Sequence, residues 1–178
     1  MEADGTRRQA SVRVGMAQMR VIAGQPRQNL QRAVEFIEQA SQAGCDLAVL
    51  PECLNICADN LPESLAIGEV LACMGAQMLV SPCAWAVPPG HDNALTPYGS
   101  LWRGAYGELA QRFGLPVVGV SNVGWVEQGN WAGHAVIGCS LAMAGDGRVL
   151  AQEPYGVDAE TLLTVELPLR AGYSPVPG

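Results

Sequence analysis

Lysine is absent from the sequence, and all ten basic residues are arginines. Any mechanism that needs a lysine from this chain is therefore excluded. Charged residues make up only 15% of the chain, and there are 17 acidic residues against 10 basic ones. This acidic balance argues against binding to the nucleic-acid backbone or to an anionic membrane surface. We predict no nucleic-acid partner and no membrane partner.

Long apolar runs are also missing, since no segment approaches the roughly 20 residues of a membrane-spanning helix. The polar N-terminal segment is neither a secretory signal nor a convincing transit peptide, so we expect a cytoplasmic protein. Its six cysteines should then be reduced thiols: Cys45, Cys53, Cys57, Cys73, Cys83 and Cys139. A zinc site is weakly supported, because Cys53 and Cys57 have no second pair to complete a tetrahedron. No nucleotide-binding glycine motif is present, and we predict no metal and no cofactor.

Apolar residues are plentiful, at 49% of the chain, and they indicate a globular domain with a packed core. Residues 12–19 have strand periodicity, residues 26–43 have helical periodicity, and residues 46–50 form a short apolar run. This order predicts a β-α-β unit with two parallel strands. The predicted buried face of the helix consists of Leu30, Ala33, Val34, Ile37 and Ala40.

The remaining elements follow the same α/β pattern. A second helix is predicted up to Gly75, with an inward face of Leu65, Ile67, Gly68, Val70, Leu71 and Met74. A strand at 78–80, a loop at 84–97, a helix at 98–113 and a strand at 116–120 follow. A hairpin around residues 145–147 and a strand at 161–167 complete the predicted domain. We place the domain at residues 12–168, between a flexible tail at 1–11 and a C-terminal tail at 169–178.

Two positions attract a chemical interpretation, although each also has a plain one. Glu52 follows a predicted buried strand, and the carboxyl ends of such strands are where open α/β sheets bind ligands. A carboxylate there suits a general base, but from position alone a solvated loop glutamate is the more common explanation. Cys57 precedes a predicted helix, where backbone dipoles can activate a thiol. Most free cysteines, however, are small buried hydrophobic residues.

Taken together, several segments resemble the nitrilase, or carbon–nitrogen hydrolase, superfamily. They are RVGMAQM, the helix with Asn29, DLAVLPE, ICAD with the following LPE, GAQMLVSPCAW, VVGVSNVGW and GCSLAMAGDGRVLA, in the order found in that family. The resemblance implies an α-β-β-α sandwich with mixed β-sheets that assembles into homo-oligomers. It also implies hydrolysis of amides, N-carbamoyl compounds or nitriles, with Glu52 as base, Cys57 as nucleophile and the Ala58 backbone N–H as an oxyanion donor.

The sequence departs from the family pattern between the base and the nucleophile. The family places a lysine and several strands and helices there, whereas here Glu52 and Cys57 are five residues apart. Five residues span at most about 17 Å, and neighbouring parallel strands need a crossover of a dozen or more residues. We therefore interpret the chain as a shortened hydrolase domain without its middle segment. Its catalysis should be severely impaired, and the alternative is an inactive remnant that only associates with other subunits.

Other residues could contribute to a pocket. A Cys–His hydrolase is conceivable because such sites assemble in space, and His91 could contact substrate, whereas His134 is expected to pack or to form hydrogen bonds. Cys83 could line the pocket, although a buried thiol at the end of a strand explains it better. Trp85 and the other three tryptophans, Trp102, Trp125 and Trp131, could shape a cleft, but tryptophans more often occupy a core or an interface.

Overall fold

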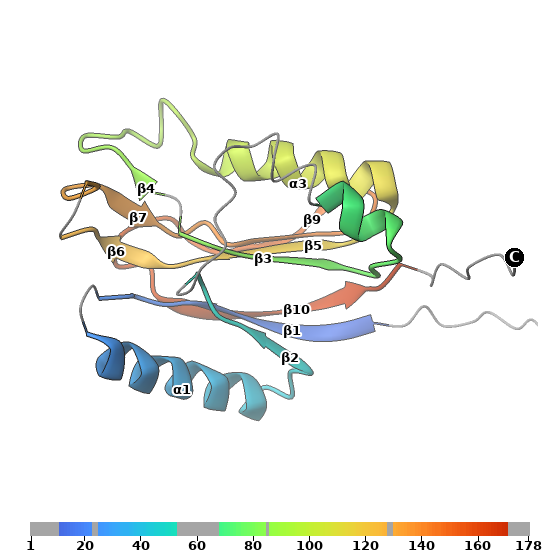
Figure 1. Ribbon diagram of the computed structural model, residues 1–178, viewed down its shortest axis with the longest axis horizontal. Coiled ribbons are helices and arrows are strands. Elements are labelled where there is room, and N and C mark those ends of the chain that lie inside the picture. The colour runs from blue at the N-terminus through green and yellow to red at the C-terminus, as the bar shows by residue number, and fades with distance from the viewer. Residues whose placement is uncertain (1–10, 23–24, 53–67, 85, 128–129, 171–178) are drawn as a thin grey trace, which may run out of the picture.

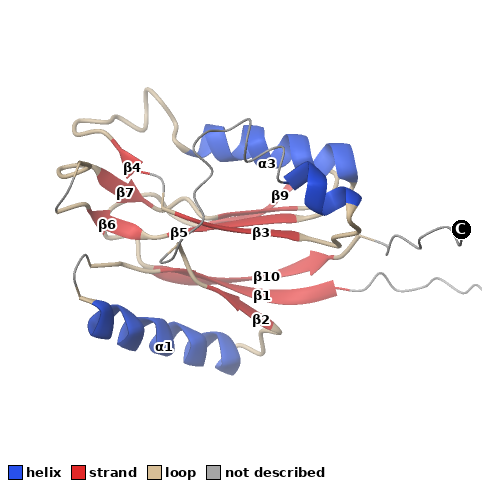
Figure 2. Cartoon of the chain, in the orientation of Figure 1, coloured by secondary structure: helices blue, strands red, loops and turns tan. Residues whose placement is uncertain are grey.

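The computed structural model describes residues 11–22, 25–52, 68–84, 86–127 and 130–170 of the chain. Its elements form an α-β-β-α sandwich (Figure 1). Helix α1 (Pro26–Gln42) covers one sheet, helix α3 (Gly99–Phe113) covers another, and these two sheets pack face to face. Figure 2 shows the same layers, with the helices on the two outer sides of the strands. The predicted fold class is confirmed.

The sheet next to α1 contains the β-α-β unit that the sequence predicts. Its strands are β1 (Ser11–Gln18), β2 (Leu47–Val49) and β10 (Thr161–Pro168), in the order β10-β1-β2. Strands β1 and β2 are parallel, with Val14 beside Leu47 and Met16 beside Val49. Strand β10 pairs antiparallel with the whole of β1. The last strand of the domain is thus hydrogen-bonded to the first.

The sheet next to α3 has the order β3-β5-β8-β9. Its strands are β3 (Leu79–Cys83), β5 (Val117–Ser121), β8 (Leu141–Met143) and β9 (Val149–Gln152). Strands β3 and β5 are parallel, and β8 and β9 form the predicted hairpin. A third, small sheet contains β4 (Ala86–Val87), β7 (Ala135–Ile137) and β6 (Val123–Trp125). Strand β4 lies in the predicted loop 84–97, because two residues are too few to show strand periodicity.

Two apolar clusters hold the layers together. Side chains of β1, β2 and β10 meet those of β5 and β8 between the two large sheets; they include Val14, Met16, Val49, Val118, Val120, Ala142, Val165 and Leu167. Helix α3 packs on the outer face of the second sheet, where Trp102 is completely buried. Ala105 and Leu109 of α3 are buried there as well.

The predicted inner face of α1 is partly wrong. Ala40 is buried and Ala33 packs against the core, as predicted, but Leu30, Val34 and Ile37 are 67%, 44% and 45% exposed. The sheet is instead covered by Phe36, which is not among the predicted inward residues. Because successive residues are about 100° apart around a helix, the apolar sector of α1 is wider than one sheet can cover.

The helix that follows the undescribed residues 53–67 differs from its prediction in the same way. Its described part, residues 68–73, contacts the core through Gly68 and the buried Ala72. Val70, Leu71 and Met74 were predicted to face inward, yet they are exposed. Leu65 and Ile67, from the same predicted face, lie outside the described residues. None of the helices that the structure describes has the combination of length and hydrophobicity needed to cross a bilayer.

Candidate active site

The candidate base, Glu52, lies at one end of the sandwich. It follows β2 by three residues, after a buried Pro51, and its own side chain is half-buried. Strands β1, β2, β3 and β5 run in the same direction, so their carboxyl ends gather at this end (Figure 1). This arrangement agrees with the placement expected for a ligand site in α/β sheets. Glu52 is therefore placed where the sequence predicted it, at the carboxyl end of a parallel strand, although β2 itself is only partly buried.

A second predicted pocket residue, Cys83, lies within electrostatic reach of Glu52. Cys83 ends β3 and is only 5% exposed, with its Sγ atom 3.3 Å from the carbonyl oxygen of Val120. Burial raises the pKa of this thiol well above its ordinary value, Tyr106 lowers the pKa, and the negative charge of Glu52 raises it. A thiol in this state stays protonated at neutral pH and is a poor nucleophile.

Three aromatic residues of α3 and its N-terminal junction fill the space behind Cys83. The ring centroids of Trp102 and Tyr106 are 5.4 Å apart in an edge-to-face arrangement, and Tyr98 lies 6.3 Å from Trp102. Burial raises the pKa of both tyrosines, so their phenols stay neutral. Trp102 is therefore a core residue and not part of an open cleft. By contrast, Trp125 and Trp131 are 57% and 60% exposed.

The two histidines occupy different environments. His91 lies in the loop between β4 and α3, where its backbone N–H donates to Pro88 O. Its Nε2 atom is buried and has no hydrogen-bond partner among the described residues. The Nδ1 atom of His134 is 3.0 Å from Trp131 O, and its ring packs 5.0 Å from the Trp131 ring. The packing and hydrogen-bonding role predicted for His134 is thereby confirmed, while the substrate contact of His91 stays a prediction.

The predicted nucleophile and its neighbour lie outside the described residues. Cys57, Ala58 and Trp85 all belong to ranges that the structure leaves undescribed. The cysteines in the described ranges, Cys45, Cys73, Cys83 and Cys139, are free thiols. The structure therefore places the candidate base, and the assignments of Cys57 as nucleophile and Ala58 as oxyanion donor stay predictions.

A buried polar cluster at the end of β1 was not predicted from the sequence. Gln18 is fully buried, and its Oε1 accepts hydrogen bonds from the Ser140 backbone N–H at 3.1 Å and from the Ser140 hydroxyl at 2.8 Å. The Ser121 N–H donates to Ser140 Oγ at 3.0 Å, which connects the end of β5. Extending the β1–β2 register by two residues places Gln18 level with Pro51, next to Glu52.

The polar cluster also contains a buried carboxyl group. Glu153 is 4% exposed, and its Oε1 accepts a hydrogen bond from the Leu163 N–H at 3.1 Å. Burial raises the pKa of Glu153 to about 8, against opposing contributions from Ser140 and from the Leu163 N–H. The available sequence signal was Gln18 at an inward position of a predicted strand. Its partners are 122 or more residues away, so periodicity could not identify them.

Comparison with known proteins supports a relationship to one family. A sequence model described as carbon-nitrogen hydrolase matches residues 13–78, a range that includes β1, α1, β2 and Glu52. No curated protein matches the chain in sequence.

Solved structures of such enzymes share the fold. A carbon-nitrogen hydrolase from Helicobacter pylori is similar with a TM-score of 0.71 and 14% identity, covering 89% of this chain and 89% of that one. A mutant amidase from Nesterenkonia, with the acetamide moiety of fluoroacetamide added covalently to its active-site cysteine, has a TM-score of 0.68 and 14% identity, covering 90% of this chain and 92% of that one. A nitrilase-superfamily protein from Saccharomyces cerevisiae has a TM-score of 0.65 and 15% identity, covering 89% and 90%.

Proposed function

We propose that this chain descends from a hydrolase of non-peptide C–N bonds. The support is its similarity to the carbon–nitrogen hydrolases, in sequence over residues 13–78 and in fold along most of its length. The substrates of this chain would be amides, N-carbamoyl compounds or nitriles. The turnover of these substrates by the chain is severely impaired. The observation that carries the proposal is the half-buried Glu52 at the carboxyl end of β2, inside the matched segment.

The proposed chemistry of an amide uses three groups of the chain. The Glu52 carboxylate takes the proton of the Cys57 thiol, and the sulfur forms a bond to the carbonyl carbon. The resulting oxyanion accepts a hydrogen bond from the Ala58 N–H. The C–N bond then breaks, the proton passes to the nitrogen, and ammonia leaves. Water hydrolyses the thioester, which releases the carboxylic acid and restores the thiol.

The impairment follows from the missing cation. No lysine is present to stabilise the oxyanion, and loss of one such donor lowers the rate by roughly 10²–10³-fold. Six of the described arginines contact other groups: Arg13 contacts Glu166, Arg20 contacts Asp158, Arg32 contacts Glu160, Arg103 contacts Gln152, Arg112 contacts Glu69 and Arg170 contacts backbone carbonyls. The five-residue spacing between Glu52 and Cys57 adds a geometric penalty to the electrostatic one.

Ammonia release tests this proposal directly. Three purified proteins, the wild type, Cys57→Ala and Cys73→Ala, are each incubated separately with acetamide, with an N-carbamoyl amino acid and with an aliphatic nitrile. We expect turnover of at most about 0.1 s⁻¹, against a usual enzymatic value near 10 s⁻¹. The residual activity should disappear in Cys57→Ala and persist in Cys73→Ala, because Cys73 is an exposed thiol outside the proposed mechanism. Turnover above about 1 s⁻¹ that depends on Cys57 would show that the site is intact.

A non-catalytic, associating protein is the second candidate. The observation that favours it is the exposed apolar stripe of α1, which consists of Leu30, Val34 and Ile37. Strand β2, on the same sheet that α1 covers, is at the edge of that sheet among the described strands. Apolar stripes and open edges are common sites of association. Labelling with iodoacetamide at neutral pH separates the candidates: faster modification of Cys57 than of Cys73 favours the hydrolase, and equal rates favour the associating protein.

A further inference from the structure

The buried polar cluster continues into the connection between β9 and β10, residues 153–160. The side-chain amide of Gln18 donates to the carbonyl oxygens of Pro154 and Ala159, at 2.9 and 2.6 Å. Backbone hydrogen bonds also hold this connection against residues 137–140, from the end of β7 to the start of β8. The Gly156 N–H donates to Ile137 O, and the Glu153 N–H donates to Ser140 O. The connection is thus held at the carboxyl end of β1 by side-chain and backbone bonds together.

The segment on which the connection rests has an unusual backbone. Cys139 has a φ of 63°, and it is the only residue other than glycine with a positive φ in the part of the chain that the structure describes. Gly138 before it has a φ of 72°, and a Cβ atom there would lie 2.3 Å from the Gln18 amide. Left-handed residues of this kind persist only where the surrounding contacts hold them. The contacts here come from Gln18 and the connection.

Glu153, at the start of the connection, is the one carboxyl of the cluster. Its Oε2 atom is buried and has no hydrogen-bond partner among the described residues. The Ser121 Oγ and Asn122 Oδ1 atoms are also buried without partners there, so this end of the sandwich holds several polar atoms that water cannot reach. A proton on Oε2 makes Glu153 neutral, and a neutral carboxyl is far cheaper to bury than an unpaired carboxylate.

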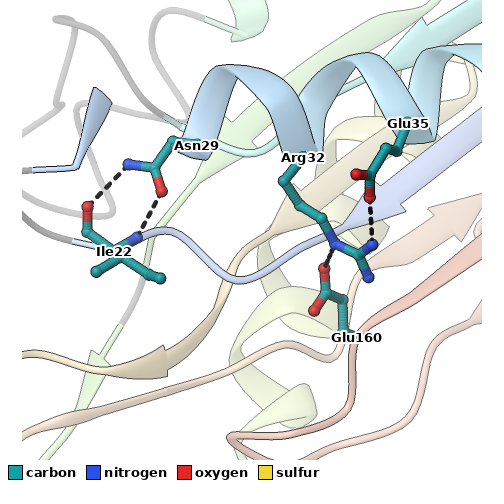
Figure 3. A network of polar contacts seen from close by, with 5 residues as sticks. All are labelled: Ile22, Asn29, Arg32, Glu35 and Glu160. Carbon is teal, nitrogen blue, oxygen red and sulfur yellow. Dashed lines mark hydrogen bonds and ion pairs between the residues drawn. The ribbon is translucent and has the colours of Figure 1, made fainter. Parts of the chain in front are cut away.

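Among the described residues, no charged side chain forms an ion pair with Glu153. Burial is the largest cause of its raised pKa, which is about 8, and no described charged side chain contributes to the shift. Among the described residues, three arginines of the surrounding elements pair with carboxylates: Arg13 with Glu166, Arg20 with Asp158, and Arg32 with Glu35 and Glu160. Arg103 keeps its charge and donates a hydrogen bond to the neutral Gln152, burial raises the pKa of Cys139, and Tyr155 is exposed. Figure 3 shows how Arg32 of α1 reaches Glu160 at the far end of the connection.

We propose that Glu153 is a proton-operated latch: in its neutral form it keeps residues 153–160 docked on Gln18, and on losing its proton it releases them. The lost proton leaves a buried charge without a cation, and the least costly relief is to rotate Glu153 into water. That rotation breaks the bond to Leu163 and withdraws the start of the connection from Ser140. Arg32 keeps its hold on Glu160, so the release begins at the Glu153 end. The latch does not depend on whether the chain turns over a substrate.

Amide hydrogen exchange between about pH 6 and pH 9.5 tests the latch, with each rate divided by the intrinsic rate at that pH. The amides to follow are those of Leu163, Gly156 and Glu153. In the wild type we expect their protection to fall by about tenfold per pH unit from pH 6 up to the Glu153 pKa of about 8, and to level off above it, because the carboxyl is then ionised in the docked state as well as in the released one. In Glu153→Gln, which imitates the neutral form, protection should stay flat. Glu166→Gln, an exposed carboxylate on β10, is the matched control and should keep the wild-type profile.

A flat profile in the wild type, or the same fall in Glu153→Gln, would overturn the proposal. A second measurement covers the case in which Glu153→Gln does not fold. Carboxyl-carbon NMR of the wild type labelled at glutamate should show one side chain titrating several pH units above the others. If every glutamate titrates below about pH 6, Glu153 is no latch.

Discussion

At Gly119, in the middle of β5, the neighbouring side chains leave no space for any residue larger than glycine. A Cβ atom added there would lie 2.3 Å from a ring atom of Tyr106 and 2.4 Å from one of Trp102. Both rings are buried between α3 and the sheet, so they have no space into which to move. The absence of a side chain at Gly119 is what lets the aromatic layer lie directly on the strand.

We therefore expect Gly119→Ala to lower the free energy of unfolding by about 1–3 kcal/mol, the usual cost of overpacking a core. Urea denaturation followed by tryptophan fluorescence measures it. Gly104→Ala on α3 is the control: no heavy atom lies within 4 Å of its added Cβ, and alanine in a helix should stabilise the protein by about 0.5–1 kcal/mol. Equal effects of the two substitutions would contradict this account of Gly119.

The residue scale also shows how much of the site could be predicted from sequence. Glu52 was identified because the apolar run before it indicated a buried strand, and strand ends have a known relation to ligand sites. Glu153 is not predicted, because periodicity does not show that the residue after the β8–β9 hairpin is covered: its carboxyl accepts from the Leu163 amide, and its backbone N–H donates to Ser140 O. Gln18, which completes the cluster, is 122 residues from Ser140, and local patterns carry no information on such long-range contacts.

At the scale of elements, α1 was predicted in extent but not in orientation. Its start agrees with the prediction because Pro26 suits the first helical turn, and Asn29 closes that turn with two 2.8 Å bonds to the backbone of Ile22 (Figure 3). Two apolar stripes lie side by side on α1, and only one of them faces the sheet: Ala33, Phe36 and Ala40 face it, whereas Leu30, Val34 and Ile37 are exposed. Phe36 decides this, since it packs with Ala17 and Met19 below the end of β1.

We expect Phe36→Ala to lower the free energy of unfolding by about 3–5 kcal/mol, since it removes a large buried ring. Ile37→Ala, at the next position but 45% exposed, should cost less than about 1 kcal/mol. Chemical denaturation at low protein concentration compares the two. If Ile37→Ala were the more damaging substitution, the outer stripe would be buried in solution, as the original periodicity predicted.

At the scale of the whole molecule, the order of the sheets determines which surfaces stay uncovered. Strand β10 closes the first sheet on one side of β1, and β2 is the strand at its other side among those described. Strand β3 is at an edge of the second sheet, and its Val80 is 38% exposed. The exposed stripe of α1 lies on the layer outside β2 (Figure 1). The domain limits, 12–168, and the internal shortening stay predictions.

We propose that the exposed stripe of α1, Leu30, Val34 and Ile37, pairs with the same stripe of a second copy of the chain. In an antiparallel arrangement of two α1 helices, Leu30 would face the partner's Ile37, and the exposed Arg27 would approach the partner's Glu38. Both the apolar contact and the pair of opposite charges would therefore favour this arrangement. We expect the wild type to sediment as a dimer at tens of micromolar and the double variant Leu30→Gln, Ile37→Gln to shift to the monomer, by about tenfold or more in Kd. Leu95→Gln, which changes a loop leucine that is 82% exposed, should leave the dimer intact. A wild type that stays monomeric over this range, or a dimer insensitive to the double variant, would assign association to another surface.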